Sequence, residues 1–309
     1  MIQKPTNTLI TIVGPTAIGK TALSIKLAKA FNADIISCDS RQFYKEMTIG
    51  TAVPDANELA AAKHHFIQNR SIFEDYNVGE FERDALSKLE ELFQQNPVQI
   101  MVGGSGLYVD AVLKGLDYFP EVDPKIRENL TKELEEKGIE PLQQKLKELD
   151  IKTYNSIAIE NPHRLMRALE VCIGSGLPYS TFKNKPKKTR NFNTIKIGLK
   201  ADREIIYNRI NQRVDIMLAN GLLEEAKKLY PHKKLNALQT VGYRELFSYF
   251  DGTFTKDFAI SEIKKNTRRF AKRQFTWFKK DKNTIWFDYK IDANKIIEEI
   301  KKKIKNNER

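Results

Sequence analysis

Cysteine, histidine and long apolar runs are scarce in this chain of 309 residues, and their scarcity excludes several classes of protein. The two cysteines, Cys38 and Cys172, lie far apart in apolar segments, so a disulfide framework is not expected. The four histidines show none of the spacings that hold a structural zinc ion. No apolar run approaches the ~20 residues of a membrane-spanning helix, and no signal-peptide core follows the first five residues. We therefore expect a cytoplasmic protein without membrane contact or a structural transition metal.

The composition is that of a globular protein with an uneven excess of positive charge. Hydrophobic residues make up 41% and charged residues 30%, and the length allows one main domain plus an insertion or second lobe. Of the net charge of +12, nine charges lie in residues 256–309, which hold 17 Lys and Arg against 8 Asp and Glu. This asymmetry favours a large polyanionic partner, although a solvated basic surface would show the same excess.

The most specific motif is a glycine-rich loop between a predicted strand (residues 8–13) and a predicted helix (residues 22–30). Its residues are Gly14, Pro15, Thr16, Ala17, Ile18, Gly19, Lys20 and Thr21. The glycines let backbone N–H groups turn inward around an anion, Lys20 adds a point charge, and the Thr21 hydroxyl can ligate Mg²⁺. The loop therefore predicts a polyphosphate site. It leaves open which polyphosphate is bound and whether a phosphoanhydride bond is broken.

Further strands with polar or glycine-rich tails accompany this P-loop. Residues 34–39 and 97–102 read as buried strands, and their tails are Asp39-Ser40-Arg41-Gln42 and Gly103-Gly104-Ser105-Gly106. Residues 194–199 and 284–287 are two later strand candidates. Because ligands bind at the carboxyl ends of parallel strands, the two tails are expected to converge on the P-loop.

Between the early and late strands lies a helical stretch. Residues 124–137, 141–149 and 162–173 have apolar residues at helical spacing, each with a proline near its start. We therefore predict an α/β fold: a P-loop-containing core with a mostly parallel sheet and a helical insertion domain. The core is expected over 1–117 and 161–309 and the insertion over 118–160. The exit boundary depends on helix 162–173, which fits either part.

Three features each admit two interpretations. Asp39, at the end of a strand, suits either the Mg²⁺-binding acid of an ATPase or a general base for an incoming nucleophile. Arg213 lies on an amphipathic helix, where arginine is more often a surface residue than an anion ligand. Residues 267–278 form a helix with basic residues on one side and aromatic residues on another. Its aromatic side chains suit a hydrophobic core better than base stacking.

Seven strings, in order along nearly the whole chain, resemble the bacterial tRNA dimethylallyltransferases, also called tRNA isopentenyltransferases. Only the P-loop is specific alone, but seven strings in one order make coincidence implausible. The other six are Asp39-Ser40-Arg41-Gln42-x-Tyr44, Ile49-Gly50-Thr51-Ala52, Val102-Gly103-Gly104-Ser105-Gly106-Leu107-Tyr108, Arg164-Leu165-x-Arg167-Ala168-Leu169-Glu170-Val171, Gly242-Tyr243-Arg244-Glu245 and the stretch from Thr267 to Trp277.

The resemblance implies transfer of the dimethylallyl group of dimethylallyl diphosphate to the exocyclic amine of the adenosine 3′ of the tRNA anticodon, with Mg²⁺ and release of diphosphate. The P-loop would then grip the leaving group, and no nucleoside triphosphate need be hydrolysed. By the family's pattern, Lys20, Thr21 with Mg²⁺, Ser105 and Arg213 neutralise the diphosphate. Asp39 would accept a hydrogen bond, or the proton itself, from the amine.

The resemblance also implies which residues meet the tRNA anticodon stem-loop. The insertion would clamp the stem, and the target adenine would flip out of the loop to reach the site. A monomer is expected. The implied contacts are Asp39, Ser40, Arg41, Gln42, Ser105, Arg127, His163, Arg164, Leu165, Met166, Arg167, Gly242, Tyr243, Arg244, Arg268, Lys272 and Arg273.

Some positions depart from the family's pattern, and two other functions stay open. Ile18 and Ser105 stand where a small residue and a threonine are usual, and Gln68 replaces a common aspartate. One alternative is an adenylate isopentenyltransferase acting on free nucleotides, which needs neither a helical insertion nor a basic C-terminal third. The other is a P-loop nucleotide-dependent kinase or NTPase. Against it, the strand 97–102 ends in glycines and serine, with no acid to hold nucleotide-bound Mg²⁺.

Overall fold

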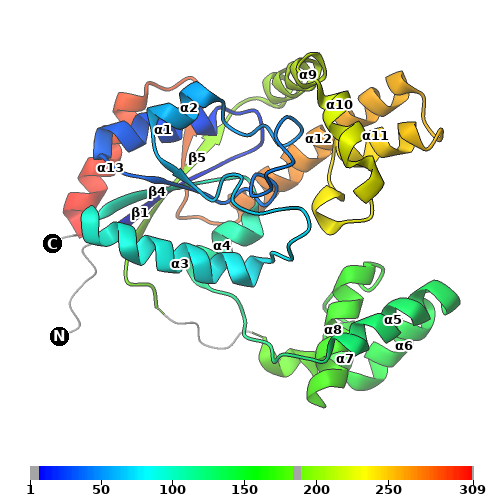
Figure 1. Ribbon diagram of the computed structural model, residues 1–309. Helices are drawn as coiled ribbons and strands as arrows, with labels where there is room; N and C mark the ends of the chain where they lie inside the picture. Colours follow the sequence, from blue (N-terminus) through cyan, green and yellow to red (C-terminus); the bar gives the residue numbers. More distant parts are fainter. Residues whose placement is uncertain (1–6, 184–188, 308–309) are drawn as a thin grey trace, which may run out of the picture. The chain divides into compact units, whose positions relative to one another are not determined.

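The computed structural model describes residues 7–183 and 189–307, and a six-stranded sheet forms its centre (Figure 1). All the neighbouring strands pair in parallel, in the order β3-β2-β4-β1-β5-β6. Because the strand order reverses at β1, the carboxyl ends of β1 and its neighbours form the edge at which such sheets bind ligands. The strands are β1 (Thr8–Val13), β2 (Ile35–Ser37), β3 (His64–His65), β4 (Val98–Val102), β5 (Asn193–Lys200) and β6 (Ile285–Asp288).

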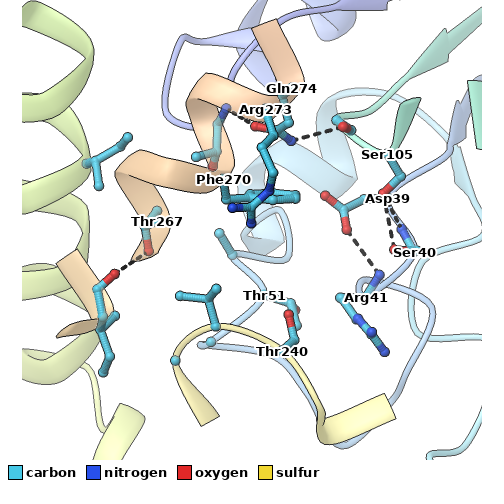
Figure 2. A pocket seen from close by; sticks show the side chains of 18 of the residues that line it. Asp39, Ser40, Arg41, Thr51, Ser105, Thr240, Thr267, Phe270, Arg273 and Gln274 are labelled. Atoms are coloured by element: carbon cyan, nitrogen blue, oxygen red, sulfur yellow. Dashed lines mark hydrogen bonds between the residues drawn. The ribbon is translucent and has the colours of Figure 1, made fainter. Parts of the chain in front are cut away.

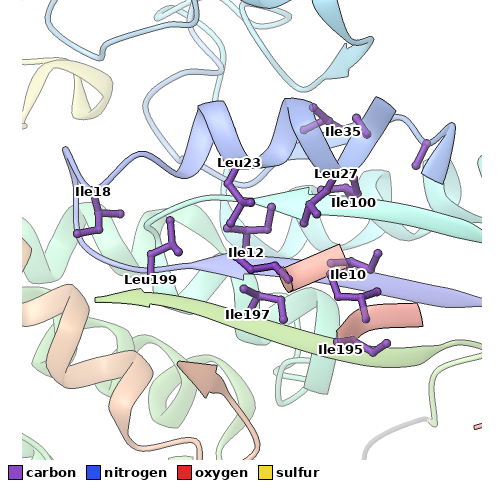
Figure 3. Packing of buried hydrophobic residues seen from close by; sticks show 14 of the residues in the cluster. Ile10, Ile12, Ile18, Leu23, Leu27, Ile35, Ile100, Ile195, Ile197 and Leu199 are labelled. Atoms are coloured by element: carbon purple, nitrogen blue, oxygen red, sulfur yellow. The ribbon is translucent and has the colours of Figure 1, made fainter. Parts of the chain in front are cut away.

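One face of the sheet is covered by α1 (Lys20–Phe31) and α13 (Ala293–Asn307). Strand β1 is buried along its whole length, as expected for a parallel strand with helices on both sides. Ile10, Ile12 and Ile197 point into this layer and pack against α1, which Figure 3 shows above the strands. The helix that follows the P-loop is thereby fixed to the strand that precedes it.

The other face of the sheet is covered by α3 (Val78–Gln95) and α4 (Gly106–Lys114). Aromatic rings dominate this layer: Phe43 stacks on Phe81 with ring centroids 5.2 Å apart, and both rings contact Tyr108. The segment after β2 is anchored to the sheet through Phe43, so the tail that begins at residue 39 has a defined course.

A third cluster joins the C-terminal helices to the segment that follows β2. The helices are α9 (Arg203–Ala219), α10 (Leu222–Leu229), α11 (Tyr243–Phe250) and α12 (Lys256–Lys279). Tyr44, Met47 and Ile72 share their apolar core. The short elements η2 (Tyr230–His232) and η3 (Asn236–Leu238) complete this part, and α2 (Ala56–Ala61) packs against α1.

Residues Gly115–Thr189 form a second compact unit with its own apolar core. It contains α5 (Pro124–Lys137), α6 (Glu140–Leu149), α7 (Ile151–Tyr154), α8 (Pro162–Ser175) and η1 (Tyr179–Phe182). The unit is longer than the predicted insertion, 118–160, which left α8 in the core. The boundary is corrected because Leu165 and Leu169 of α8 are fully buried among the leucines of α5 and α6. The first unit is interrupted between Lys114 and Arg190.

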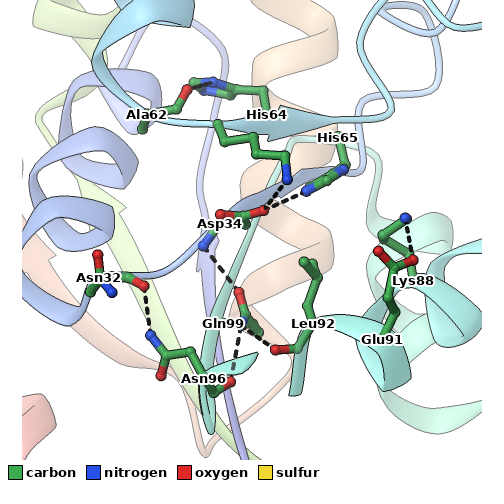
Figure 4. A network of polar contacts seen from close by, with 11 residues as sticks. Asn32, Asp34, Ala62, His64, His65, Lys88, Glu91, Leu92, Asn96 and Gln99 are labelled. Carbon is green, nitrogen blue, oxygen red and sulfur yellow. Dashed lines mark hydrogen bonds and ion pairs between the residues drawn. The ribbon is translucent and has the colours of Figure 1, made fainter. Parts of the chain in front are cut away.

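A polar network closes the sheet at the end opposite the predicted site (Figure 4). The Asp34 carboxylate lies 2.8 Å from the imidazole of His65, its neighbour on β3, and the two share a hydrogen bond. Buried Gln99 of β4 accepts the N–H of Asp34 at 3.0 Å and donates to the carbonyls of Leu92 and Asn96. The sequence predicted five of the six strands and missed β3, whose two residues are too few to give a pattern. In the described ranges, every helix is too short or too polar to cross a membrane.

Candidate active site

A cavity of about 550 Å³ opens at the carboxyl ends of β2 and β4 and is bounded on the far side by α9 and α12. Figure 2 shows Asp39 and Ser105 on one wall and Phe270 and Arg273 of α12 on another. Thr16 brings the P-loop to this cavity, and Gly242 and Arg244 bring the start of α11. The structure therefore brings both strand tails to the P-loop, as the sequence predicted, and adds the basic helix α12, which the prediction did not include.

The P-loop is shaped by close packing and by left-handed backbone. Gly14 has φ +145°, and a Cβ atom there would lie 2.8 Å from the backbone oxygen of Leu199. Ala17 also has positive φ, at 63°. Arg209 of α9 braces this turn by donating to the Ala17 carbonyl at 2.6 Å. The loop is thus held from β5 on one side and from α9 on the other.

Lys20 begins α1 and folds back over the loop. Its Nζ donates to the carbonyl oxygens of Gly14 at 3.0 Å and Pro15 at 2.8 Å. Burial lowers the pKa of Lys20 to about 8, an effect that the negative charge of Asp39 opposes and that Arg213 adds to. Among the described residues, the ammonium has no charged partner in contact, and an incoming anion would stabilise its charged form.

Asp39 and Ser105 come from neighbouring strand tails. One carboxylate oxygen of half-buried Asp39 accepts the N–H of Arg41 at 3.1 Å, and no salt bridge to it is found in the described residues. The Ser105 hydroxyl accepts the N–H of Ser40 at 3.1 Å and donates to the Ser40 hydroxyl, also at 3.1 Å. The carboxylate thus has a free oxygen that faces the cavity, beside an ordered hydroxyl.

Arg213 of α9 is a half-buried cation that lines the cavity. Burial, together with the nearby charge of Arg209, lowers its pKa. Its guanidinium forms no hydrogen bond or ion pair with any of the residues that the structure describes. The structure therefore places Arg213 at the cavity and not on the fully exposed surface.

Arg41 and Gln42, predicted to contact tRNA, are engaged within the protein. Arg41 donates to the carbonyls of Asn236 and Ala237, both at 3.0 Å, and so ties the tail of β2 to η3. Gln42 donates to the carbonyl of Ala52 at 2.9 Å. Arg41 itself lines the cavity, whereas Gln42 supports its wall through Ala52.

The segment from Ile49 to Ala52 is fixed by a carboxylate that the sequence analysis did not single out. Glu225 of α10 accepts the N–H groups of Thr48, Ile49 and Gly50 at 2.8–3.0 Å. It also accepts the hydroxyl of fully buried Tyr243 at 2.6 Å. Tyr243, predicted to contact tRNA, thus lies with its side chain in the core, whereas its neighbours Gly242 and Arg244 line the cavity.

Some basic and aromatic residues of α12 line the cavity, and others lie outside it. Arg273 lines the cavity; Lys272 is exposed elsewhere, and Arg268 is bonded to Asn211 at 2.8 Å. Phe278 is buried in the core, as predicted. Phe270 and Trp277 instead are 37% and 40% exposed and line the cavity, so the preference for a core position was wrong for these two rings.

In the second unit, buried Glu170 organises two arginines. It contacts Arg127 at 2.7 Å and Arg167 at 3.3 Å, and both guanidinium groups remain about half exposed. His163 and Arg164 are exposed at the start of α8. The side chains of Leu165 and Met166 are buried in the unit's core, so they can serve packing but not direct recognition.

The chain offers oxygen donors for a magnesium ion. Thr21 is half-buried at the start of α1, and the Asp39 charge is felt at the adjacent Lys20. Among the described residues, no group of three or more His, Cys, Asp or Glu side chains could hold a metal. This donor set fits Mg²⁺, which prefers few protein oxygens and completes its shell with phosphate oxygens and water.

Three residues that shape the cavity escaped the sequence analysis: Arg209, Glu225 and Gln274. Arg209 and Gln274 each contact a loop more than 150 residues away in sequence. Glu225 contacts segments that lie before and after it in the chain. An arginine, a glutamate and a glutamine on amphipathic helices carry no local signal of such contacts.

The P-loop and the parallel sheet covered by helices on both faces define an α/β P-loop protein. Within this class, residues 42–281 of the chain match the sequence profile of the IPP transferase family. The chain belongs to this family, and the predicted family and fold class are confirmed.

Relatives of known name and structure agree with this placement. The tRNA dimethylallyltransferase of Flavobacterium psychrophilum is 67% identical over 97% of this chain and all of its own, and that of Flavobacterium johnsoniae is 65% identical over 96% and 98%. The structure of a tRNA isopentenylpyrophosphate transferase from Bacillus halodurans has a TM-score of 0.72 at 37% identity, covering 97% of this chain and 96% of that one. A eukaryotic dimethylallyltransferase acting on tRNA has a TM-score of 0.77 at 26% identity, over 92% and 74%.

Proposed function

We propose that this chain transfers the dimethylallyl group of dimethylallyl diphosphate to the exocyclic amine of the adenosine 3′ of the anticodon in tRNA. The observation that carries the proposal is the cavity itself. It combines Arg213, a cation without an acid partner among the described residues, with a carboxylate, Asp39, that keeps one oxygen free, and the P-loop that carries Lys20 reaches it through Thr16. A leaving diphosphate requires the cations, and an attacking amine requires the carboxylate.

The reaction forms a bond between the adenine amine and C1 of the dimethylallyl group while the bond from C1 to the diphosphate oxygen breaks. Negative charge grows on the diphosphate as it leaves, and Lys20, Arg213 and the Ser105 hydroxyl stabilise that charge. The amine becomes positively charged as it reacts, and its proton passes to the Asp39 carboxylate.

Magnesium is proposed as the cofactor, with Thr21 as the residue that would hold it. When bound, it would add positive charge at the diphosphate oxygens. The protein's own part is to present the Thr21 hydroxyl at the start of α1, next to Lys20.

The RNA partner is proposed from the distribution of cations. Arg244 and Arg273 line the cavity mouth, where a flipped adenosine would bring its phosphates. In the second unit, Arg127 and Arg167, with exposed His163 and Arg164, would contact the anticodon stem. We also propose that the protein acts as a monomer in the cytoplasm.

Two alternatives are less well supported. An enzyme for free adenylates would have no use for the paired arginines that Glu170 presents in a separate unit. A kinase or NTPase would need an acid at the end of β4, where this chain has Gly103, Gly104 and Ser105.

One assay tests the proposal against both alternatives. The protein is incubated with labelled dimethylallyl diphosphate, Mg²⁺, total tRNA, AMP and ATP, and the labelled product is identified. We expect label only on tRNA, at the adenosine that follows the anticodon. Label on AMP, or turnover of ATP without prenyl transfer, would reject the proposed function.

A further inference from the structure

Gln274 of α12 joins the two loops that would hold the diphosphate, and we propose that it is a positioning residue for this group. Its Oε1 accepts the N–H of Thr16 in the P-loop at 2.9 Å, and its Nε2 donates to the Gly104 carbonyl at 3.0 Å. The side chain is only 5% exposed, so water competes poorly for either bond. Figure 2 shows it above the cavity, next to Ser105.

The local geometry is specific for this side chain. A Cβ atom on Gly104 would lie 2.1 Å from the Gln274 Nε2, so the glycine at the end of β4 allows the close approach. One bond needs an acceptor and the other needs a donor, and an uncharged amide supplies both. Methionine has a similar shape but supplies neither, and an ionised glutamate supplies only the acceptor.

The contacts set the distance between two parts of the proposed diphosphate site. Thr16 belongs to the loop that ends at Lys20, and Gly104 directly precedes Ser105. Gln274 therefore fixes the P-loop relative to the Ser105 hydroxyl. Because Gln274 already accepts the N–H of Thr16, the anion must be bound by the backbone N–H groups that follow in the loop.

The same contacts connect the donor site to the helix that would face the RNA. Phe270, Arg273 and Trp277 line the cavity from α12, on the side of the helix that carries Gln274. A shift of α12 would displace the P-loop and the tail of β4 together. This inference rests on the proposed function, because it assigns Gln274 to the diphosphate of that reaction.

Two substitutions test the assignment. Gln274→Met should raise the Kd for inorganic diphosphate and the KM for dimethylallyl diphosphate about tenfold, since two buried positioning bonds are removed. Affinity for an anticodon stem-loop RNA should change little. Gln274→Glu should be impaired at pH 8 but recover relative to the unsubstituted protein as the pH falls towards 5.5, because a protonated carboxyl group can again donate to the Gly104 carbonyl.

Gln99→Met is the matched control. Gln99 is 2% exposed and makes the same kind of bonds, one accepted from a backbone N–H and others donated to carbonyls, but at the opposite end of the sheet. Its replacement should lower the unfolding temperature without changing the Kd for diphosphate. Unfolding temperatures of all three variants show whether each is folded at the assay temperature.

The outcomes separate this inference from the proposed function. An unchanged Kd in Gln274→Met, an equal increase in Gln99→Met, or a pH-independent activity ratio for Gln274→Glu would overturn the positioning role. Diphosphate binding is measured without RNA, so this part of the test applies even if the unsubstituted protein modifies no tRNA. Failure to modify tRNA would reject the proposed function alone.

Discussion

Single residues at the cavity differ from ordinary surface charges in what surrounds them. Among the described residues, the Lys20 ammonium hydrogen-bonds to backbone carbonyls alone, and Arg213 is half-buried with its pKa lowered by burial. Leaving such cations without an acid is unfavourable in the free protein, and an anionic ligand would remove that cost. Asp39 is held by one backbone N–H group and keeps its other oxygen for a substrate.

Replacement of Asp39 by asparagine tests its role as the proton acceptor. The amide keeps an oxygen for the N–H of Arg41 but cannot take a proton from the amine. We expect the single-turnover transfer rate to fall by about 10²-fold or more, with RNA affinity almost unchanged. Asp34→Asn, at the other end of the same strand, is the control. A single-turnover rate equal to that of the control would exclude Asp39 as the base.

The pKa of Lys20 predicts how diphosphate affinity depends on pH. Because a bound anion favours the charged ammonium, the pKa of Lys20 is higher in the complex than the value of about 8 in the free protein. Below pH 8, the positive charge of Lys20 contributes fully to diphosphate binding. This contribution is lost as the pH rises from 8 towards the higher pKa of Lys20 in the complex. Calorimetry with inorganic diphosphate should therefore show weaker binding and proton uptake above pH 8.

Lys20→Arg is the control for this pH effect. Arginine stays charged throughout the range, so its profile contains only the titration of diphosphate itself and of other groups. The difference between the two profiles isolates Lys20. Identical profiles would mean that Lys20 does not change its protonation on binding.

Structural elements were predictable where the sequence pattern of a single segment is enough to identify them. The P-loop, the buried strands and the proline-started helices of the second unit all follow from local pattern, and the strand 8–13 and the helix 124–137 have the predicted bounds. Contacts between distant segments were not predictable. Nothing near Gln274 or Glu225 in sequence indicates the backbone groups that they bind, and the exposure of Trp277 depends on how α12 lies beside α4.

Gly50 is an element-scale example of such a contact, and its replacement by alanine has a defined expected cost. The new Cβ atom would lie 2.6 Å from the ring of Tyr243, whose hydroxyl contacts Glu225. The ring is fully buried and cannot move freely, so we expect a decrease of about 1–3 kcal/mol in the free energy of unfolding, measured with urea. In a Tyr243→Leu background, Gly50→Ala should cost less. An equal cost in both backgrounds would show that the ring is not the obstacle.

At the scale of the whole molecule, the chain is divided into two compact units, and we propose that both contact one RNA. The second unit has its own leucine-rich core, and the buried Glu170 orients exposed Arg127 and Arg167 on it. The first unit carries the cavity and most of the basic C-terminal region. Separate cores allow each unit to be tested for its share of RNA binding.

Excision of the second unit should leave a folded first unit. Arg190 donates to the carbonyls of Ala111 and Val112, at 2.7 and 2.8 Å, near the end of α4. The chain therefore leaves and re-enters the first unit at adjacent points, and a flexible Gly-Ser linker of about six residues should replace residues 116–188 without strain. Circular dichroism and cooperative thermal unfolding would show whether the shortened chain folds.

The shortened chain should separate the two binding activities. We expect its Kd for inorganic diphosphate to match that of the full chain, because the P-loop, Arg213 and Gln274 all belong to the first unit. Its affinity for an anticodon stem-loop RNA should fall, and the slope of log affinity against log salt should become shallower by about 0.7–0.9 for each RNA phosphate that the second unit neutralises in the full chain. Arg127→Gln in the full chain should make the slope shallower by the amount expected for one RNA phosphate. A shortened chain with unaltered RNA affinity and an unaltered slope would place recognition of the stem entirely in the first unit.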